Sequence, residues 1–241
     1  MKNKIKYLLF IPFLFLFLAG CSSKNITTTK NEYSADGLVA VVKGNAKGYS
    51  KVSYTQNGKT KSTKVTSNKF VFSVPVSSND QTVKITAKDG SNTSSTSVTV
   101  KKAKPMTDYT TYAQSYNYML LQSGSENSQL PLIFSDGIHK VNYNDGLTYR
   151  FNVQNGSLMG ISIKVPMKTL KSKDGAKNFA QELAISSQLV GSDGQKVLKK
   201  LSKEFKDVQD GNTTTIDAVK SKGIIYNVNY STSGIYIYIT K

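Results

Sequence analysis

Few residues in this chain of 241 could support catalysis. It contains one histidine, His139, and one cysteine, Cys21. Acid–base catalysis by histidine can therefore rest only on His139, which follows Ile138 in a predicted strand and is expected to be a partly exposed strand residue. A zinc site needs three or four His, Cys or acidic ligands, and the sequence offers no such set. We expect no metal site, no cofactor and no catalytic residue.

Paired carboxylates are the remaining route to an enzyme, because two such groups are brought together by folding rather than by sequence spacing. The candidates in the second half of the chain are Glu126, Asp136, Asp145 and Asp217. The three aspartates fall near predicted turns, where this residue type has a local hydrogen-bonding role. We expect a protein that is not an enzyme, and a cell-wall hydrolase using a carboxylate pair is the alternative.

The residues before Cys21 indicate that its thiol has a different chemistry. Residues 1–20 hold three lysines, followed by a dozen consecutive apolar or aromatic residues. That run is too short to span a hydrocarbon core of ~30 Å but matches the apolar centre of a secretory signal. The run ends in the sequence Leu18-Ala19-Gly20-Cys21, which resembles the lipobox of bacterial lipoproteins.

The lipobox resemblance implies a location. In that family a peptidase cuts before the cysteine, here between Gly20 and Cys21, and the sulfur carries diacylglycerol. Two acyl chains such as palmitate hold a protein stably at a membrane. Residues 1–20 are thus expected to be a lipoprotein signal peptide, with Cys21 anchoring the chain to the extracytoplasmic face of the cell membrane.

The net charge of the chain indicates which classes of binding partner are favoured. The formal charge is +17, and because residues 1–20 hold three lysines and no acid, the remaining chain carries +14. Such a surface favours anionic neighbours, among them anionic polymers of the cell envelope. Arg150 is the only arginine, and nucleic-acid recognition depends heavily on the guanidinium fork, so nucleic acid is disfavoured as a partner.

The first part of the chain is predicted to be a polar tether over residues 21–35 and a β-sandwich over residues 36–104. Short segments alternate apolar and polar residues and are separated by turn residues such as Asn57-Gly58. These predicted strands are Leu38–Val42, Lys51–Thr55, Phe70–Val74, Thr82–Ala87 and Thr96–Val100. The segments KFVFSVPV, QTVKITAKDG and STSVTVKK resemble the bacterial immunoglobulin-like (Ig-like) modules of Gram-positive surface proteins, which implies a spacer or adhesion unit. Lys101–Pro105 is predicted to be an exposed linker.

The remainder, residues 105–241, is predicted to be an α+β domain with an antiparallel sheet and about three helices on one of its faces. Tyr109, Tyr112 and Tyr116 lie on one stripe of the first helix, more typical of core than of a ligand platform. The predicted strands are Leu130–Phe134, Ile138–Tyr143, Leu147–Val153, Leu158–Val165, Gly223–Tyr230 and Ile235–Thr240. Two further helices carry apolar stripes at 176–184 and 197–208, the second with capping-box spacing at Ser192 and Gln195.

Three functional hypotheses follow. The first is a non-catalytic surface lipoprotein, in which an Ig-like stalk presents an α+β domain that binds a partner or ligand in the envelope. The second is the wall-acting hydrolase. The third is a prophage-type exclusion lipoprotein, which composition permits and no residue demands.

Overall fold

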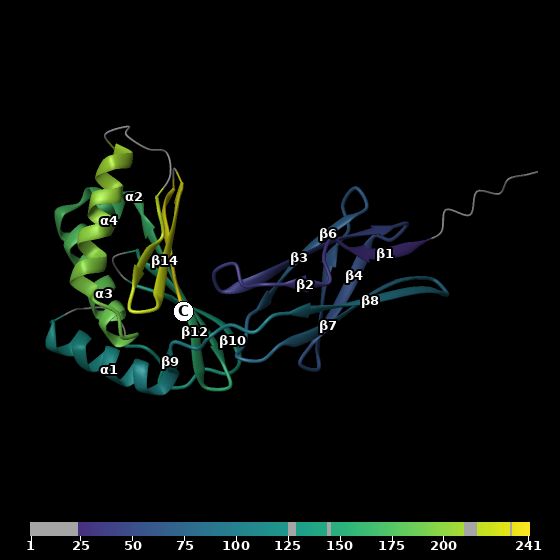
Figure 1. The fold of residues 1–241 in the computed structure, drawn as a ribbon, viewed down its shortest axis with the longest axis horizontal. Helices are drawn as coiled ribbons and strands as arrows, with labels where there is room; N and C mark the ends of the chain where they lie inside the picture. The colour runs from purple at the N-terminus through teal and green to yellow at the C-terminus, as the bar shows by residue number, and fades with distance from the viewer. Residues whose placement is uncertain (1–23, 125–128, 144–145, 210–215, 232) are drawn as a thin grey trace, which may run out of the picture.

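In a computed structural model, the described residues are 24–124, 129–143, 146–209, 216–231 and 233–241, with the side chains of 207–209 left out. They form two regions, an N-terminal region of strands over 24–104 and a C-terminal region of strands and helices over 105–241 (Figure 1). The predicted signal peptide and Cys21 lie outside the described residues. Among those residues, no helix is both long and apolar enough to cross a membrane.

The N-terminal region consists of two sheets around one apolar core. The three-stranded sheet has the order β1-β3-β6, with β1 at Asn25–Thr28, β3 at Val39–Lys47 and β6 at Lys69–Pro75. The five-stranded sheet has the order β2-β8-β7-β4-β5, with β2 at Glu32–Tyr33, β8 at Asn92–Val100, β7 at Gln81–Asp89, β4 at Lys51–Gln56 and β5 at Lys59–Lys64. Alternate residues of these strands, such as Val42, Val74 and Val83, are fully or almost fully buried between the sheets.

The prediction of a flexible tether over 21–35 is wrong for most of that segment. β1 pairs antiparallel with β3, and β2 pairs parallel with β8. Ile26 and Tyr33 are buried, and the Tyr33 hydroxyl donates a hydrogen bond to Lys43 O at 2.8 Å. Each of these strands is too short to show an alternating pattern, because only one apolar residue per strand faces the core.

The segment predicted as a linker is hydrogen-bonded to the N-terminal region. Lys101 Nζ lies 2.8 Å from Asp80 Oδ2, Lys102 N donates to Asp80 Oδ1 at 2.7 Å, and Ala103 N donates to Ser77 O at 2.8 Å. Met106 is buried, and its N–H donates to Leu158 O in the C-terminal region at 2.9 Å. The chain is thus fastened on both sides of Pro105.

The C-terminal region has one antiparallel sheet of order β10-β11-β12-β15-β14-β13, and the two-residue β9 also pairs with β12. The strands are β9 (Thr107–Asp108), β10 (Gly137–Asn142), β11 (Thr148–Gln154), β12 (Ser157–Pro166), β13 (Val219–Ser221), β14 (Ile224–Ser231) and β15 (Gly234–Thr240). The helices are α1 (Tyr109–Gln122), α2 (Met167–Lys171), α3 (Lys173–Leu189) and α4 (Gly194–Gln209). Helices α1, α3 and α4 lie on the side of the sheet away from the N-terminal region (Figure 1).

Helix starts and turns follow local chemistry. Asp108 caps α1 by accepting from Thr111 N at 2.8 Å. At α4 the expected cap is wrong: Asp193 Oδ1 accepts from Lys196 N, whereas the Ser192 hydroxyl is buried and donates to Ser187 O. The predicted strand at Leu130–Phe134 is also absent, because the Asn117 side chain pairs with both backbone groups of Leu130.

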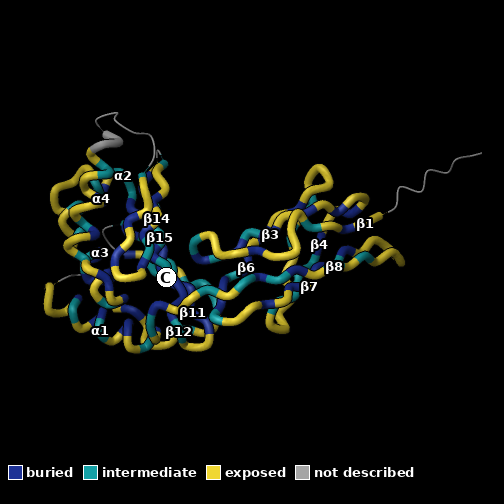
Figure 2. The backbone as a smooth tube through the Cα atoms, viewed as in Figure 1, coloured by how far each residue is buried: buried dark blue, intermediate teal, exposed yellow. Residues whose placement is uncertain are grey.

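Burial separates the two sides of the helical layer. Figure 2 shows exposed positions along the outer sides of α3 and α4 and buried positions along the sheet that they cover. The three tyrosines of the α1 stripe are all buried in the same core as the sheet. The stripe is therefore core, as its spacing indicates.

Candidate functional site

The sheet of the C-terminal region has one face that the helices do not cover. On β11, Tyr149, Phe151 and Val153 are fully buried in the core below the helices. Because side chains alternate along a strand, Thr148 and Arg150 point to the opposite face, where both are half-buried. The helix-free face is therefore the part of this sheet that is open to a ligand.

Strand pairing aligns the polar residues of that face in two rows that cross the sheet. The first row is Lys140, Arg150, Ser162, Tyr238 and Asn227, each residue directly opposite the next on the neighbouring strand. The second row is Asn142, Thr148, Lys164, Tyr236 and Asn229. We call these ten residues the open face. They comprise three cations, two tyrosines, three amides and two hydroxyls, and none is an acid.

The three cations are neighbours. Lys140 is directly opposite Arg150, and Lys164 lies diagonally from Arg150, at the spacing of roughly 7–8 Å that diagonal partners have. Lys164 Nζ also lies 5.6 Å from the centre of the Tyr236 ring, a cation–π contact. Ion pairs among the described residues involve Lys24 and Lys101, both outside this sheet. Within the described chain, the three cations thus have no carboxylate partner.

The N-terminal region borders the open face along one end. Asn152, which is fully buried, donates hydrogen bonds from Nδ2 to Leu38 O at 3.0 Å and to Val76 O at 2.8 Å. Its own Oδ1 accepts from Gln154 Nε2 at 2.8 Å. A Cβ atom at Gly160 would lie 2.6 Å from Leu38 Cδ2, so a larger residue there would displace the Leu38 side chain. These contacts seat the end of the N-terminal region at the border of the open face, where Gly37 also lies against the ring of Tyr238.

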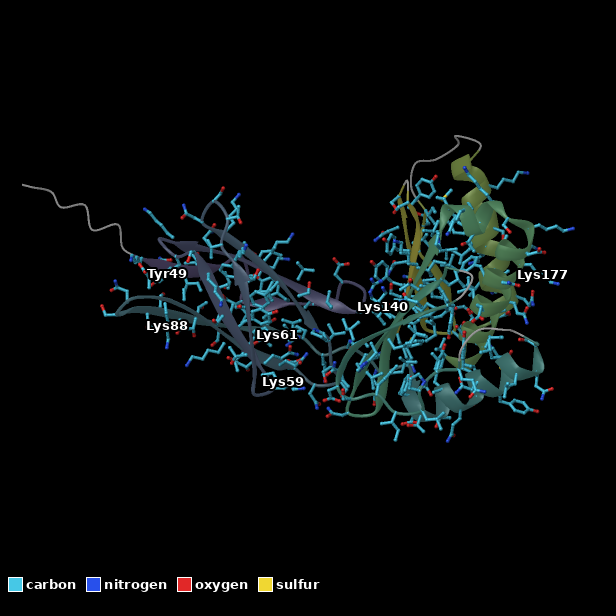
Figure 3. The ribbon with its side chains drawn as sticks, turned by 180° about the vertical axis from the view of Figure 1, so that it is seen from behind. Tyr49, Lys59, Lys61, Lys88, Lys140 and Lys177 are labelled. Atoms are coloured by element: carbon cyan, nitrogen blue, oxygen red, sulfur yellow. The ribbon has the colours of Figure 1, made fainter. Side chains whose placement is uncertain are left out.

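A small cleft lies at this junction. It encloses about 160 Å³ and is lined from the N-terminal side by residues that include Tyr54, Lys59 and Lys61, and from the C-terminal side by Asp136, Gly137 and Gln154. Figure 3 shows Lys59 and Lys61 on the N-terminal region and Lys140 on the side of the C-terminal region that is turned toward it. A volume of that size accommodates a small molecule about as large as benzene, whereas the broader open face can take a larger ligand.

Of the four candidate carboxylates, the two that the structure describes are not brought together. Asp136 Oδ1 accepts from Asn155 N at 2.7 Å just before β10, and Asp217 N donates to Glu204 Oε2 at 3.3 Å just before β13. These strands are the two edges of the six-strand order, so five strand spacings, about 24 Å, separate them. A glycosidase pair lies within about 10 Å. Glu126 and Asp145 lie outside the described residues.

Sequence reasoning missed a buried carboxylate, Glu182 on α3, which is 3% exposed. The Tyr116 hydroxyl donates to its Oε2, and the Tyr112 hydroxyl donates to Ser186 Oγ at 3.2 Å. Burial raises the pKa of the Tyr112 and Tyr149 hydroxyls in this cluster well above the ordinary value. The signal that could have found Glu182 is its spacing of three residues from Phe179, which places it on the apolar stripe.

His139 has a structural role. Its ring stacks on Phe134 with 4.1 Å between ring centres, and Nε2 lies 2.6 Å from Ser135 O. It is half-buried on β10, opposite Phe151 and hence on the helix side of the sheet. Among the described residues, no group of three or more His, Cys, Asp or Glu side chains could hold a metal ion.

Comparisons with known proteins give no family for this chain. Neither a protein-family model nor a curated protein matches the sequence. Among solved structures, it is similar to apo β-glucuronidase 3 of Bacteroides uniformis, with a TM-score of 0.30 and 8% identity over 57% of this chain and 16% of that one. A second Bacteroides uniformis β-glucuronidase gives a TM-score of 0.28 and 11% identity over 58% of this chain and 20% of the enzyme. The chain spans no more than a fifth of these enzymes, and similarity at this level carries no inference about fold or activity.

Proposed function

We propose that this protein is a non-catalytic lipoprotein, anchored to the extracytoplasmic face of a bacterial cell membrane through lipid on Cys21. An Ig-like domain, formed by the N-terminal region, presents the α+β domain of the C-terminal region in the envelope. The open face of that domain binds a partner or ligand, for which anionic envelope polymers are the leading class.

The observation that carries the binding proposal is the open face. One face of the sheet is polar, and nine of its ten named residues are at least partly exposed, Ser162 being the buried one. The face combines cations, amides and tyrosine rings without an acid. A face whose only role was to be exposed to solvent would not require this combination of residues. A hydrolase would need a carboxylate there, and the ten residues include none.

The anchor proposal rests on the lipobox sequence, and the Ig-like proposal on the motifs together with two sheets that enclose one core. Cys21→Ala should release the protein from membranes or leave the precursor uncut. Detergent phase partition and the mass of the mature amino terminus measure this. An unmodified amino terminus at another position in the unaltered protein would contradict the anchor.

Binding is tested with the chain from residue 22 onward, sedimented with isolated cell envelopes. A variant carrying Asn227→Ala, Asn229→Ala and Tyr236→Ala should lose most of its binding, because it removes three of the ten open-face side chains without changing charge. The matched control carries Asn178→Ala, Gln181→Ala and Gln195→Ala, three exposed polar residues on α3 and α4. Equal binding by both variants would show that the open face is not the binding surface.

A further inference from the structure

We propose that Lys140, Arg150 and Lys164 form a binding site for an oxyanion, a phosphate or a carboxylate group carried by a polyhydroxyl polymer. This inference rests on the proposed function and names the chemistry of the ligand that the open face takes.

The position of the only arginine supports such a site. Thirty-two residues are lysine or arginine, and Arg150 is the single guanidinium among them. It lies half-buried on β11, one strand in from the edge of the sheet and in the middle of the three cations. A guanidinium donates two parallel N–H bonds to one oxyanion, which a lysine cannot do.

The charges on neighbouring strands also favour a bound anion. Like charges directly opposite each other on antiparallel strands destabilise a sheet, and Lys140 and Arg150 are such a pair. Within the described residues, neither forms an ion pair with a carboxylate. A bound oxyanion would convert this repulsion into two attractive contacts.

A hydroxyl lies beside the guanidinium. Ser162 is directly opposite Arg150 on β12 and is 2% exposed. Because directly paired residues of antiparallel strands point to the same face, this hydroxyl is placed as a further donor to an oxygen held by Arg150.

The rest of the open face determines the kind of molecule that carries the oxyanion. The first row crosses five strands from Lys140 to Asn227, a span of about 19 Å at the usual strand spacing. Beyond the cations it offers amides and tyrosines, groups that bind hydroxyls and sugar or polyol surfaces. A span of that length beside the N-terminal region fits several units of a polymer better than one small molecule.

The test is calorimetric titration of the chain from residue 22 onward with three oligomers: glycerol phosphate, galacturonate and uncharged dextran. We expect one of the two anionic oligomers to bind, and the one that binds identifies the oxyanion. The double variant Arg150→Gln with Lys140→Gln should bind it at least about tenfold more weakly. Arg150→Lys, which keeps the charge but not the fork, should fall between the two.

The matched control is Lys88→Gln with Lys177→Gln, which removes the same charge from two exposed positions away from the open face. It should leave the affinity within about twofold. An equal loss in the control would mean diffuse attraction and would overturn the site, as would dextran binding that survives Arg150→Gln. Thermal melting confirms that each variant is folded.

The same variants separate this inference from the proposed function. If envelopes still bind the Arg150→Gln, Lys140→Gln variant but not the Asn227, Asn229 and Tyr236 variant, the open face binds its partner and the oxyanion site is wrong. If envelopes bind no form of the protein, the proposed function fails, and the titration with oligomers still decides the oxyanion site.

Discussion

The two faces of the C-terminal sheet are made from alternate residues of the same strands, yet they differ in almost every property. The helix side of β11 holds Tyr149, Phe151 and Val153, all without exposed surface. The other side holds Thr148 and Arg150, both half-exposed. Asn152, the next residue on that side, is buried against the N-terminal region. Alternate residues of a single strand can therefore belong to the core on one face and, under the proposed function, to a binding surface on the other. Substitutions on the two faces should therefore have separable effects.

The largest effect is expected on the helix side. Phe151→Ala removes a fully buried ring that packs against Tyr109, Tyr112 and Tyr149, and should lower the free energy of unfolding by about 3–5 kcal/mol. Urea unfolding measures the loss. A change below about 1 kcal/mol would mean that this face is not the core that its burial indicates.

Alkaline pH should also act on the helix side. Because burial raises the pKa of the Tyr112 and Tyr149 hydroxyls, the folded protein keeps protons that the unfolded chain releases near pH 10. The contribution of these two hydroxyls to the free energy of unfolding is fully present below that pH. It is lost as the pH rises above it, by up to about 1.4 kcal/mol per pH unit for each group.

Urea unfolding at increasing alkaline pH tests this expectation. Tyr112→Phe should reduce the slope of the free energy of unfolding against pH, because phenylalanine has no proton to release. Tyr118→Phe is the control, since Tyr118 is 65% exposed on the outer side of α1 and should leave the slope as it is. Equal slopes in the unaltered protein and in both variants would contradict burial of the tyrosine hydroxyls as the cause.

A substitution at the border between the two regions should have an intermediate effect on the free energy of unfolding. Asn152→Ala leaves Leu38 O and Val76 O without their amide donor and should cost about 1–3 kcal/mol. Limited proteolysis should then cut faster at 101–105, because the end of the N-terminal region is held less firmly. Asn227→Ala, an exposed amide of the open face, is the control and should leave the cutting rate unchanged.

The smallest effect on stability is expected at the centre of the open face. Arg150→Gln should change the free energy of unfolding by less than about 0.5 kcal/mol, and in the stabilising direction, because it removes one of two facing cations. Urea unfolding in parallel with Phe151→Ala makes the comparison direct. A large loss at Arg150 would mean that this residue holds the fold rather than a ligand.

The alternation of apolar and polar residues, together with the turn residues between segments, is sufficient to predict most of the strands. Asn155-Gly156 forms the β11–β12 hairpin with both residues at positive φ, as its sequence predicts. β5 was missed because its sequence KTKSTK has no apolar residue, as befits the edge of a sheet. The apolar residues of 130–134 wrongly predict a strand, because an extended apolar run has the same sequence pattern whether its backbone pairs with a strand or with the Asn117 side chain.

The candidate site could not be predicted from the sequence. Arg150 stood out by composition alone, but its neighbours Lys140, Ser162 and Lys164 come from other strands, and only the register of pairing brings them together. Alternation along β11 indicates two faces without saying which one the helices cover. That choice depends on how α1, α3 and α4 pack, a tertiary property.

The parallel pairing of β2 with β8 has a mechanical consequence. In a parallel pair, the start of one strand and the end of the other lie at opposite ends, so a pull on the chain before Glu32 against the chain after Val100 runs along both strands. The hydrogen bonds from Thr99 N to Asn31 O and from Lys101 N to Tyr33 O, both 2.8 Å, would then be loaded together instead of opening one after the other. Tension applied at the amino-terminal end would therefore meet resistance before the core of the N-terminal region is exposed.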